Sequence, residues 1–206
     1  MTLLYEIIAL LLALTLHEFA HALVGDWLGD TTARQQGRLS LNPAAHIDPF
    51  ATLLLPLLLI LVGSPVIFAA AKPVPFNPWA LRWGRWGAAL VALAGPATNF
   101  LLAIGFGLYM RFVHIGTAGY QLLGTIVVIN VTIGLFNLIP FPPLDGSRVL
   151  YAAAPPALRE AMDRIEQAGM VVVFLVLFVL YPFLVPFLGK ISGAIISWLV
   201  PSGGLP

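Results

Sequence analysis

Cysteine is absent from this chain of 206 residues, and charged residues make up only 9% of it. The lack of cysteine excludes disulfides and thiolate ligands, so any metal site has to use histidine and carboxylate side chains. Soluble domains carry about 25% charged residues. The low charge, together with 60% hydrophobic residues, predicts an integral, multi-pass membrane protein that folds as a single domain over residues 1–206.

Long basic runs are also missing, and the formal net charge is only +1. The sequence therefore gives no indication of nucleic-acid binding. Residues 1–25 lack a positively charged start, and their apolar run exceeds the roughly 7–15 residues typical of a signal peptide. We expect this segment to be retained as a membrane span.

His17, Glu18 and His21 form the pattern His-Glu-x-x-His inside the apolar run Leu3–Val24. Ionisable groups are costly inside a membrane, so a function is the default explanation for them. At about 100° per residue, the two histidines lie about 40° apart on a helix, and Glu18 lies within about 100° of both. Two imidazoles can then bind one Zn²⁺ while the carboxylate activates a zinc-bound water. The alternative is that both histidines are buried residues with structural roles only.

The apolar segments predict an α-helical bundle of about four to six membrane helices. Uninterrupted or nearly uninterrupted spans are expected at 3–24, 87–110, 120–139 and 168–184. Segment 51–71 is broken by Gly63-Ser64-Pro65, which favours a re-entrant segment over a full crossing. The polar loop 31–49 is expected to contain short strands. The sequence leaves open whether 187–200 is a return helix or lies at the membrane interface.

A catalytic zinc ion usually has three protein ligands and an open position for water. Apart from the histidine pair, the candidate ligands are few: Asp26, Asp30, His46, Asp48, His114 and Asp145. Asp145 fits best, because it ends an apolar span and follows a proline-rich stretch, 140–143, that prevents regular helix. Irregular backbone at membrane depth is tolerated only where it is buried or lines a cavity. Alternatively, Asp145 only caps the helix that begins near Ser147.

The topology of the spans tests this choice. Asp145 reaches the histidine pair only if the two spans that carry these ligands run in the same direction, with one full crossing between them. A re-entrant path for 51–71 leaves 87–110 as that crossing. It also places eight basic residues on the side of the histidines and two on the other; the eight are Arg34, Arg38, Lys72, Arg82, Arg85, Arg148, Arg159 and Arg164. Because basic residues mark cytoplasmic loops, we expect the site near the cytoplasmic face and the N-terminus outside.

Three motifs follow one another on these spans: HEFAH (17–21), GPATNF (95–100) and NLIPFPPLDG (137–146). Together they resemble the site-2 protease family of intramembrane zinc metalloproteases, over roughly residues 1–150. PDZ and CBS domains, which many members carry, are not found in this sequence. It resembles the compact bacterial and archaeal members, which implies a prokaryotic cell membrane as its location.

This resemblance implies one zinc ion per chain, bound by His17, His21 and Asp145. It implies that Glu18 is the catalytic carboxylate. The catalytic core is then expected at about 1–150, followed by C-terminal helices at 150–200.

Five further polar side chains are candidates for a supporting role, either in catalysis or in the structure. Asn137 lies at membrane depth and is our candidate for a catalytic donor to the oxyanion, or else it satisfies backbone groups that the prolines leave unpaired. Asn99 is expected to bond to a neighbour, and Gly95-Pro96 before it to permit close helix packing; Asn130 is expected to have a structural role. His46 and Asp48 belong to a solvated loop, or they orient a zinc-bound histidine or contact the substrate.

The resemblance implies hydrolysis of peptide bonds in or near transmembrane segments, and the His-Glu-x-x-His pattern suits a zinc-bound water activated by Glu18. The expected partners are a transmembrane protein or peptide substrate and the lipid bilayer. Two other classes remain open. A membrane metal-binding or ion-transport protein uses buried His and Asp but has no need of Glu18. A non-catalytic scaffold for membrane helices needs neither the full ligand set nor the carboxylate.

Overall fold

The computed structural model describes residues 2–48, 54, 58, 61, 72–167 and 170–200. Within this part of the chain all regular structure is helical, without strands. The elements in chain order are α1 (Thr2–Trp27), α2 (Thr32–Gln35), the 3-10 helix η1 (Pro43–Ala45), α4 (Arg85–Phe112), α5 (Thr117–Asn137), α6 (Asp145–Ala153), α7 (Pro156–Gln167) and α8 (Met170–Leu199). Four of them, α1, α4, α5 and α8, contain stretches long and apolar enough to cross a membrane. The predicted polytopic helical fold is confirmed.

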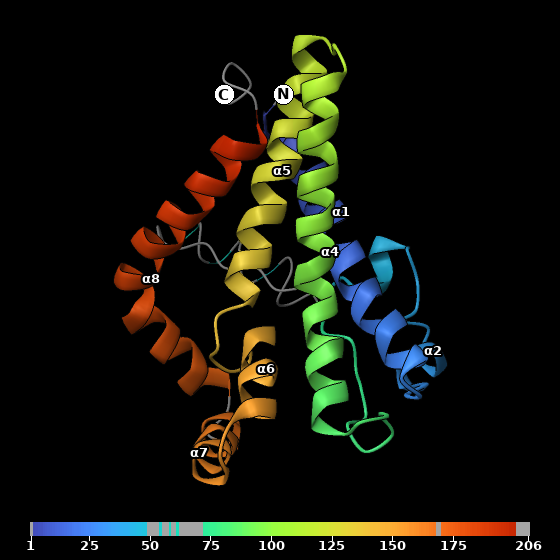
Figure 1. Ribbon diagram of the computed structural model, residues 1–206, viewed down its shortest axis with the longest axis vertical. Helices are drawn as coiled ribbons and strands as arrows, with labels where there is room; N and C mark the ends of the chain where they lie inside the picture. The colour runs from blue at the N-terminus through green and yellow to red at the C-terminus, as the bar shows by residue number, and fades with distance from the viewer. Residues whose placement is uncertain are drawn as a thin grey trace.

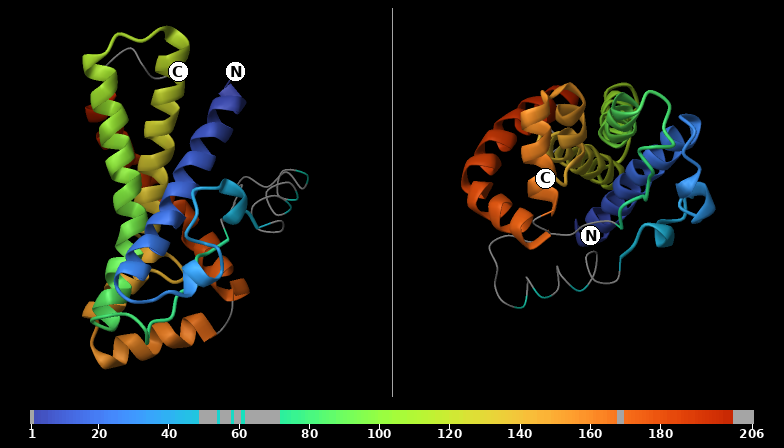
Figure 2. Two further views of the ribbon diagram at one scale, coloured as in Figure 1. Left: turned by 90° about the vertical axis from the view of Figure 1, so that its right-hand side faces the viewer. Right: turned by 90° about the horizontal axis from the view of Figure 1, so that it is seen from below.

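The spanning helices alternate in direction. In Figure 1, α1 and α5 both run from the end marked N toward α6, and α4 runs the opposite way beside them. Figure 2 shows α7 lying across the end of the molecule that carries α6. Among the described residues, α4 is thus the one span between α1, which carries the histidines, and α5, which ends shortly before Asp145. This is the single crossing that a shared site requires. Segment 51–71 lies almost wholly outside the described residues, so its re-entrant path stays a prediction.

Small residues allow α4 to pack closely against both α1 and α5. Ala9 and Ala13 of α1 and Ala103 of α4 are fully buried. Lipid tails are as apolar as the side chains, so membrane helices associate through such close packing and through polar contacts. At the opposite end of α4 from the site, a Cβ on Gly107 would lie 3.0 Å from the Leu199 Cβ, so α8 also approaches closely there.

The C-terminal helix α8 continues through Pro182 and Pro186 without ending. Each proline lacks an N–H and its ring displaces the carbonyl four residues earlier, so it bends the helix. Figure 1 shows α8 bowed away from α5 in its first half and returning to the bundle at its C-terminal end. The guanidinium of Arg111 donates to the Trp198 carbonyl and lies 5.6 Å from the centre of its ring. Residues 187–199 therefore continue one long helix and do not form a separate return helix.

The expectation of strands in loop 31–49 is wrong for the described part of that loop. Thr32 N–H donates to the Asp30 carboxylate at 3.0 Å, where the chain turns into α2. The Asn42 side chain accepts a backbone N–H at 3.1 Å and caps η1. Such local bonds from side chain to backbone compete with strand pairing. The polar residues of this loop therefore favour turns and short helices.

Candidate metal centre

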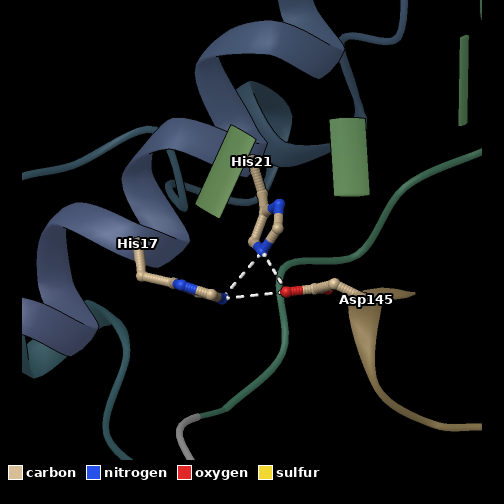
Figure 3. A group of neighbouring side chains, drawn as sticks. All are labelled: His17, His21 and Asp145. Atoms are coloured by element: carbon tan, nitrogen blue, oxygen red, sulfur yellow. Dashed lines mark hydrogen bonds and ion pairs between the residues drawn. The ribbon is translucent and has the colours of Figure 1, made fainter. Parts of the chain in front are cut away.

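His17 and His21 lie on one face of α1, and Asp145 approaches them from the first residue of α6 (Figure 3). The Asp145 Oδ2 atom lies 3.1 Å from His17 Nε2 and 3.3 Å from His21 Nε2. The two Nε2 atoms are 3.0 Å apart. Both histidines are buried. The structure thus brings together the three predicted metal ligands, and their ligand atoms all lie within 4.8 Å of one another.

The break between α5 and α6 places Asp145 at this depth. The three prolines of 140–143 end the helical pattern, and the chain turns through 138–144 before α6 begins. Gly146 lies so close to the Leu138 carbonyl that a Cβ there would collide with it. Only glycine lets the start of α6 fold back against the end of α5 in this way. The Asp145 carboxylate is consequently held at the level of the histidine pair.

The other nitrogen of each imidazole is held by a neighbouring acceptor. His17 Nδ1–H donates to the Asn99 Oδ1 atom at 2.6 Å, and His21 Nδ1–H donates to the Val91 carbonyl at 2.7 Å. A neutral imidazole carries one N–H, so these bonds leave the lone pair on Nε2 in both rings. Hydrogen bonds of this kind commonly fix the tautomer and orientation of metal-bound histidines.

Three acceptor atoms therefore converge on one point. Two imidazole lone pairs and a carboxylate oxygen repel one another unless a cation lies between them, either a proton or a metal ion. The Asp145 Oδ2 atom is buried and has no hydrogen-bond partner within the described structure, as expected for an atom reserved for a cation. Zn²⁺ binds His nitrogen and carboxylate oxygen, and three protein ligands leave a position open for water. The residues present fit a catalytic zinc ion.

Gly95 of α4 borders the same point. A Cβ on Gly95 would lie 2.6 Å from His17 Nε2 and still closer to His21 Nε2. Real side-chain carbons do not approach ring atoms so closely, so any other residue here would displace the imidazoles. The sequence suggests only close helix packing at this glycine. The structure shows that the space it leaves is occupied by the ligand atoms of the metal centre.

Asn99 and Asn130 link the centre to the packing of three helices. The Asn99 Nδ2 group donates to Asn130 Oδ1 at 2.8 Å and to the Ala13 carbonyl at 3.3 Å. Asn130 in turn donates to the Ile126 carbonyl at 2.9 Å. Both asparagines are fully buried. Asn99 bonds to neighbouring helices as expected. The sequence did not predict that one of its partners is His17, a candidate metal ligand.

A signal for this role exists in the sequence. Gly95 and Asn99 are four residues apart, as His17 and His21 are, so each pair lies on one helix face. Two such faces that meet between α1 and α4 bring the polar residues into register.

Glu18 lies beside the ligands and has a backbone partner. It is buried, and its Oε2 atom accepts the Val74 N–H at 3.1 Å. Val74 belongs to the segment that leads to α4, so this segment contacts the His-Glu-x-x-His motif of α1 beside the metal-ligand candidates.

The remaining candidate residues lie elsewhere. Asp26 pairs with Arg34, and Asp30 binds backbone groups of the loops. His114 is exposed in the connection between α4 and α5, at the opposite end of the bundle in Figure 1. The structure therefore leaves Asp145 as the carboxylate that meets the histidine pair among the described residues.

His46 of the loop and Asn137 of α5, for which the sequence leaves more than one role open, both bond to nearby backbone carbonyls. His46 is buried, which contradicts a solvated position for this residue, and its Nε2–H donates to the Ser40 carbonyl at 2.8 Å. The Nδ1 atoms of His17 and His21 bond to Asn99 and Val91, so His46 is not the residue that orients either ring. Asn137 donates to the Ile133 carbonyl of its own helix at 3.1 Å.

The fold and the site define a helical protein with candidate membrane spans and a His-His-Asp cluster that could hold a metal ion beside a buried glutamate. Comparison with known proteins identifies the class further. The model of peptidase family M50 matches residues 113–180. YwhC of Bacillus subtilis, which is named as a zinc metalloprotease, is 41% identical over 184 residues, covering 85% of this chain and 80% of YwhC.

A second relative agrees. Rip2 of Mycobacterium tuberculosis, also named as a zinc metalloprotease, is 32% identical over 197 residues, covering 95% of this chain and 72% of Rip2. No solved structure matches the chain. The chain belongs to peptidase family M50, the site-2 protease family, and is a zinc metalloprotease.

Proposed function

We propose that this protein hydrolyses peptide bonds in or near the transmembrane segments of membrane proteins, with one zinc ion bound by His17, His21 and Asp145. The observation that carries the proposal is the position of the histidine pair within the apolar helix α1, where Asp145 meets it. His21 lies six residues before the exposed Trp27, which is about 9 Å along α1. Tryptophan gathers at membrane interfaces, so this spacing supports a metal centre below the headgroups.

The proposed chemistry divides between the metal and the protein. When bound, zinc lowers the pKa of a ligand water toward about 7 and polarises the carbonyl oxygen of the peptide. Glu18 accepts the proton from that water and later delivers it to the leaving nitrogen. Its neighbour in sequence, His17, is a ligand, so Glu18 is placed within reach of the reacting atoms without contributing to the ligand set itself.

Asn137 is proposed as the donor that stabilises the oxyanion. An amide NH₂ carries two hydrogens, and the bond to the Ile133 carbonyl uses one of them. The second hydrogen remains for the substrate. Asn137 is the last residue of α5, at the beginning of the turn that leads to Asp145.

A transmembrane helix resists proteolysis because its backbone groups are already bonded within the helix. We therefore propose that substrates are membrane proteins or peptides whose spans unwind locally near the site. The eight basic residues expected at this end of the molecule support a cytoplasmic orientation of the site in a prokaryotic cell membrane. Nucleic acid is not expected as a partner.

The substitution Glu18→Gln tests the assignment. Wild-type and E18Q proteins are produced in the same cells, new peptide termini are compared by mass spectrometry, and zinc per chain is measured in the purified proteins. We expect termini within membrane spans to disappear in E18Q while the zinc content is unchanged. Termini that persist in E18Q would contradict catalysis by Glu18. A metal transporter or a helix-binding scaffold would retain its function in this variant.

A further inference from the structure

An extended segment, residues 72–77, crosses the end of α1 beside Glu18; we call it the strap. Its N-terminal end is bound to the loop after α1, because Lys72 N–H donates to the His46 carbonyl at 2.9 Å. At its middle, Val74 N–H donates to the Glu18 carboxylate at 3.1 Å. The strap is therefore fixed to the loop before it reaches the catalytic glutamate.

The sequence of the strap singles out the Val74 amide. Pro73 and Pro75 flank it and carry no N–H, so Val74 supplies the one donor of these three residues. A residue before proline is restricted to extended conformations, which applies to both Lys72 and Val74. The strap thus stays extended, and it pairs with no strand in the part of the chain that the structure describes. Its single central donor points at Glu18.

The far end of the strap is bound to a buried carboxylate. Asp30 is only 2% exposed, and its Oδ2 atom accepts the Asn77 N–H at 2.5 Å. Its Oδ1 atom accepts from the backbone and the hydroxyl of Thr32, at 3.0 and 2.5 Å. A buried carboxylate with both oxygens bonded is a rigid anchor, and it joins the end of α1 to the strap.

Apolar contacts hold the strap against the helix that supports His21. Phe76 packs against a buried cluster formed by Leu28, Leu81, Ala88 and Val91. Val91 is the residue whose carbonyl binds His21 Nδ1. On another side, the Arg148 guanidinium lies 6.0 Å from the centre of the Phe76 ring. The strap therefore contacts α1, α4 and α6, the helices that carry Glu18, the candidate metal ligands and the partners of the two histidines.

We propose that the strap is a positioning device for Glu18 and that Asp30 is a positioning residue that acts through it; this inference rests on the proposed function. A glutamate side chain has three rotatable bonds and samples several rotamers unless it is held. The Val74 N–H fixes Oε2 and so sets the direction of Oε1, the oxygen left for proton transfer. Catalytic groups need such a supporting shell to stay in the productive geometry.

Amide hydrogen exchange of the full chain in lipid nanodiscs tests the contact without any substrate. The peptide that contains the strap has few exchanging amides, because prolines carry none. We expect Glu18→Ala to accelerate exchange of one of these amides by roughly tenfold. Glu160→Ala, which removes an exposed carboxylate of α7, is the matched control and leaves the strap unchanged. Equal exchange in wild type and E18A would overturn the proposed contact.

Kinetics of two substitutions at one position separate the N–H from the side chain. Val74→Pro removes the donor, whereas Val74→Ala keeps it. With a membrane peptide identified by the comparison of termini, we expect kcat of V74P to be roughly tenfold below that of V74A, at similar KM and equal zinc content. Equal kcat values for V74P and V74A would overturn the positioning role.

The substitution Asp30→Ala tests the anchor. It is expected to accelerate exchange in the strap and to lower kcat more than it raises KM, because the substrate contacts remain. A change in KM alone, or unchanged exchange, would overturn the role of Asp30. Failure of the proposed function gives a different result: wild-type protein then produces no peptide termini that depend on Glu18, while the exchange experiment still reports on the strap.

Discussion

The amide oxygen of Asn99 lies 2.6 Å from Nδ1 of His17, and this contact joins the metal centre to the packing of the bundle. The same amide group donates to α1 and to Asn130 of α5. One buried side chain thus fixes both the tautomer of a ligand and the spacing of three helices. The centre and the bundle are therefore expected to respond together to changes at Asn99.

Replacement of Asn99 by alanine removes the acceptor that holds His17. Loss of such an outer partner lowers metal affinity by roughly 10–100-fold. We expect the zinc dissociation constant of N99A to rise by this factor, measured by competition with a chromogenic chelator. Thr132→Ala on the exposed face of α5 is the control and keeps the wild-type affinity. Wild-type affinity in N99A would show that the contact with His17 is not needed for ligation.

Replacement of Gly95 by alanine places a Cβ within 2.6 Å of His17 Nε2. Because α4 is packed on both sides, we expect the imidazoles to move and stoichiometric zinc binding to be lost. Gly105→Ala in the same helix is the matched control, since a Cβ there meets nothing within 4 Å. If G95A binds zinc as tightly as G105A does, the close approach of α4 to the ligands is incorrect.

Zinc is expected to stabilise the folded protein because it offsets the repulsion of three converging acceptors. A ligand at 100 times its dissociation constant adds about 2.7 kcal/mol to the free energy of unfolding. We expect zinc to raise the Tm of metal-stripped wild-type protein and to leave the Tm of D145A unchanged. Asp163→Ala removes a carboxylate that binds Tyr151 outside the centre, and its Tm should still respond to zinc. A zinc-dependent increase in D145A equal to that of wild type would remove Asp145 from the ligand set.

Alanine at Asn137 distinguishes a catalytic amide from a structural one. Loss of an oxyanion donor costs about 10²–10³ in kcat. We expect a decrease of this order in N137A with unchanged zinc affinity, since the described contacts of Asn137 do not include the metal ligands. A kcat close to that of wild type, with a lowered Tm, would instead support the structural interpretation.

The three candidate ligands could be predicted from the sequence because each is marked by residues close to it in the chain. The histidines lie one turn apart on a helix, and helix periodicity alone places them on one face. Asp145 could be selected from six candidates because proline-rich backbone at membrane depth has to be buried. The strands expected in loop 31–49 are not formed in its described part, because the side chains of Asp30 and Asn42 accept backbone N–H groups two residues further on and so favour turns.

The sequence by itself determined the apolar spans, the shared face of His17 and His21 and the proline-rich break that precedes Asp145, because each depends on neighbours within a few residues. Only the tertiary structure decided that Asn99 holds His17 and that Val74 N–H reaches Glu18. These contacts join segments about 56–82 residues apart. The first contact depends on the crossing angle and register of helices that are apolar on nearly every face, and such faces carry no periodic pattern from which the register can be read. The second depends on the path of a segment that has no regular secondary structure.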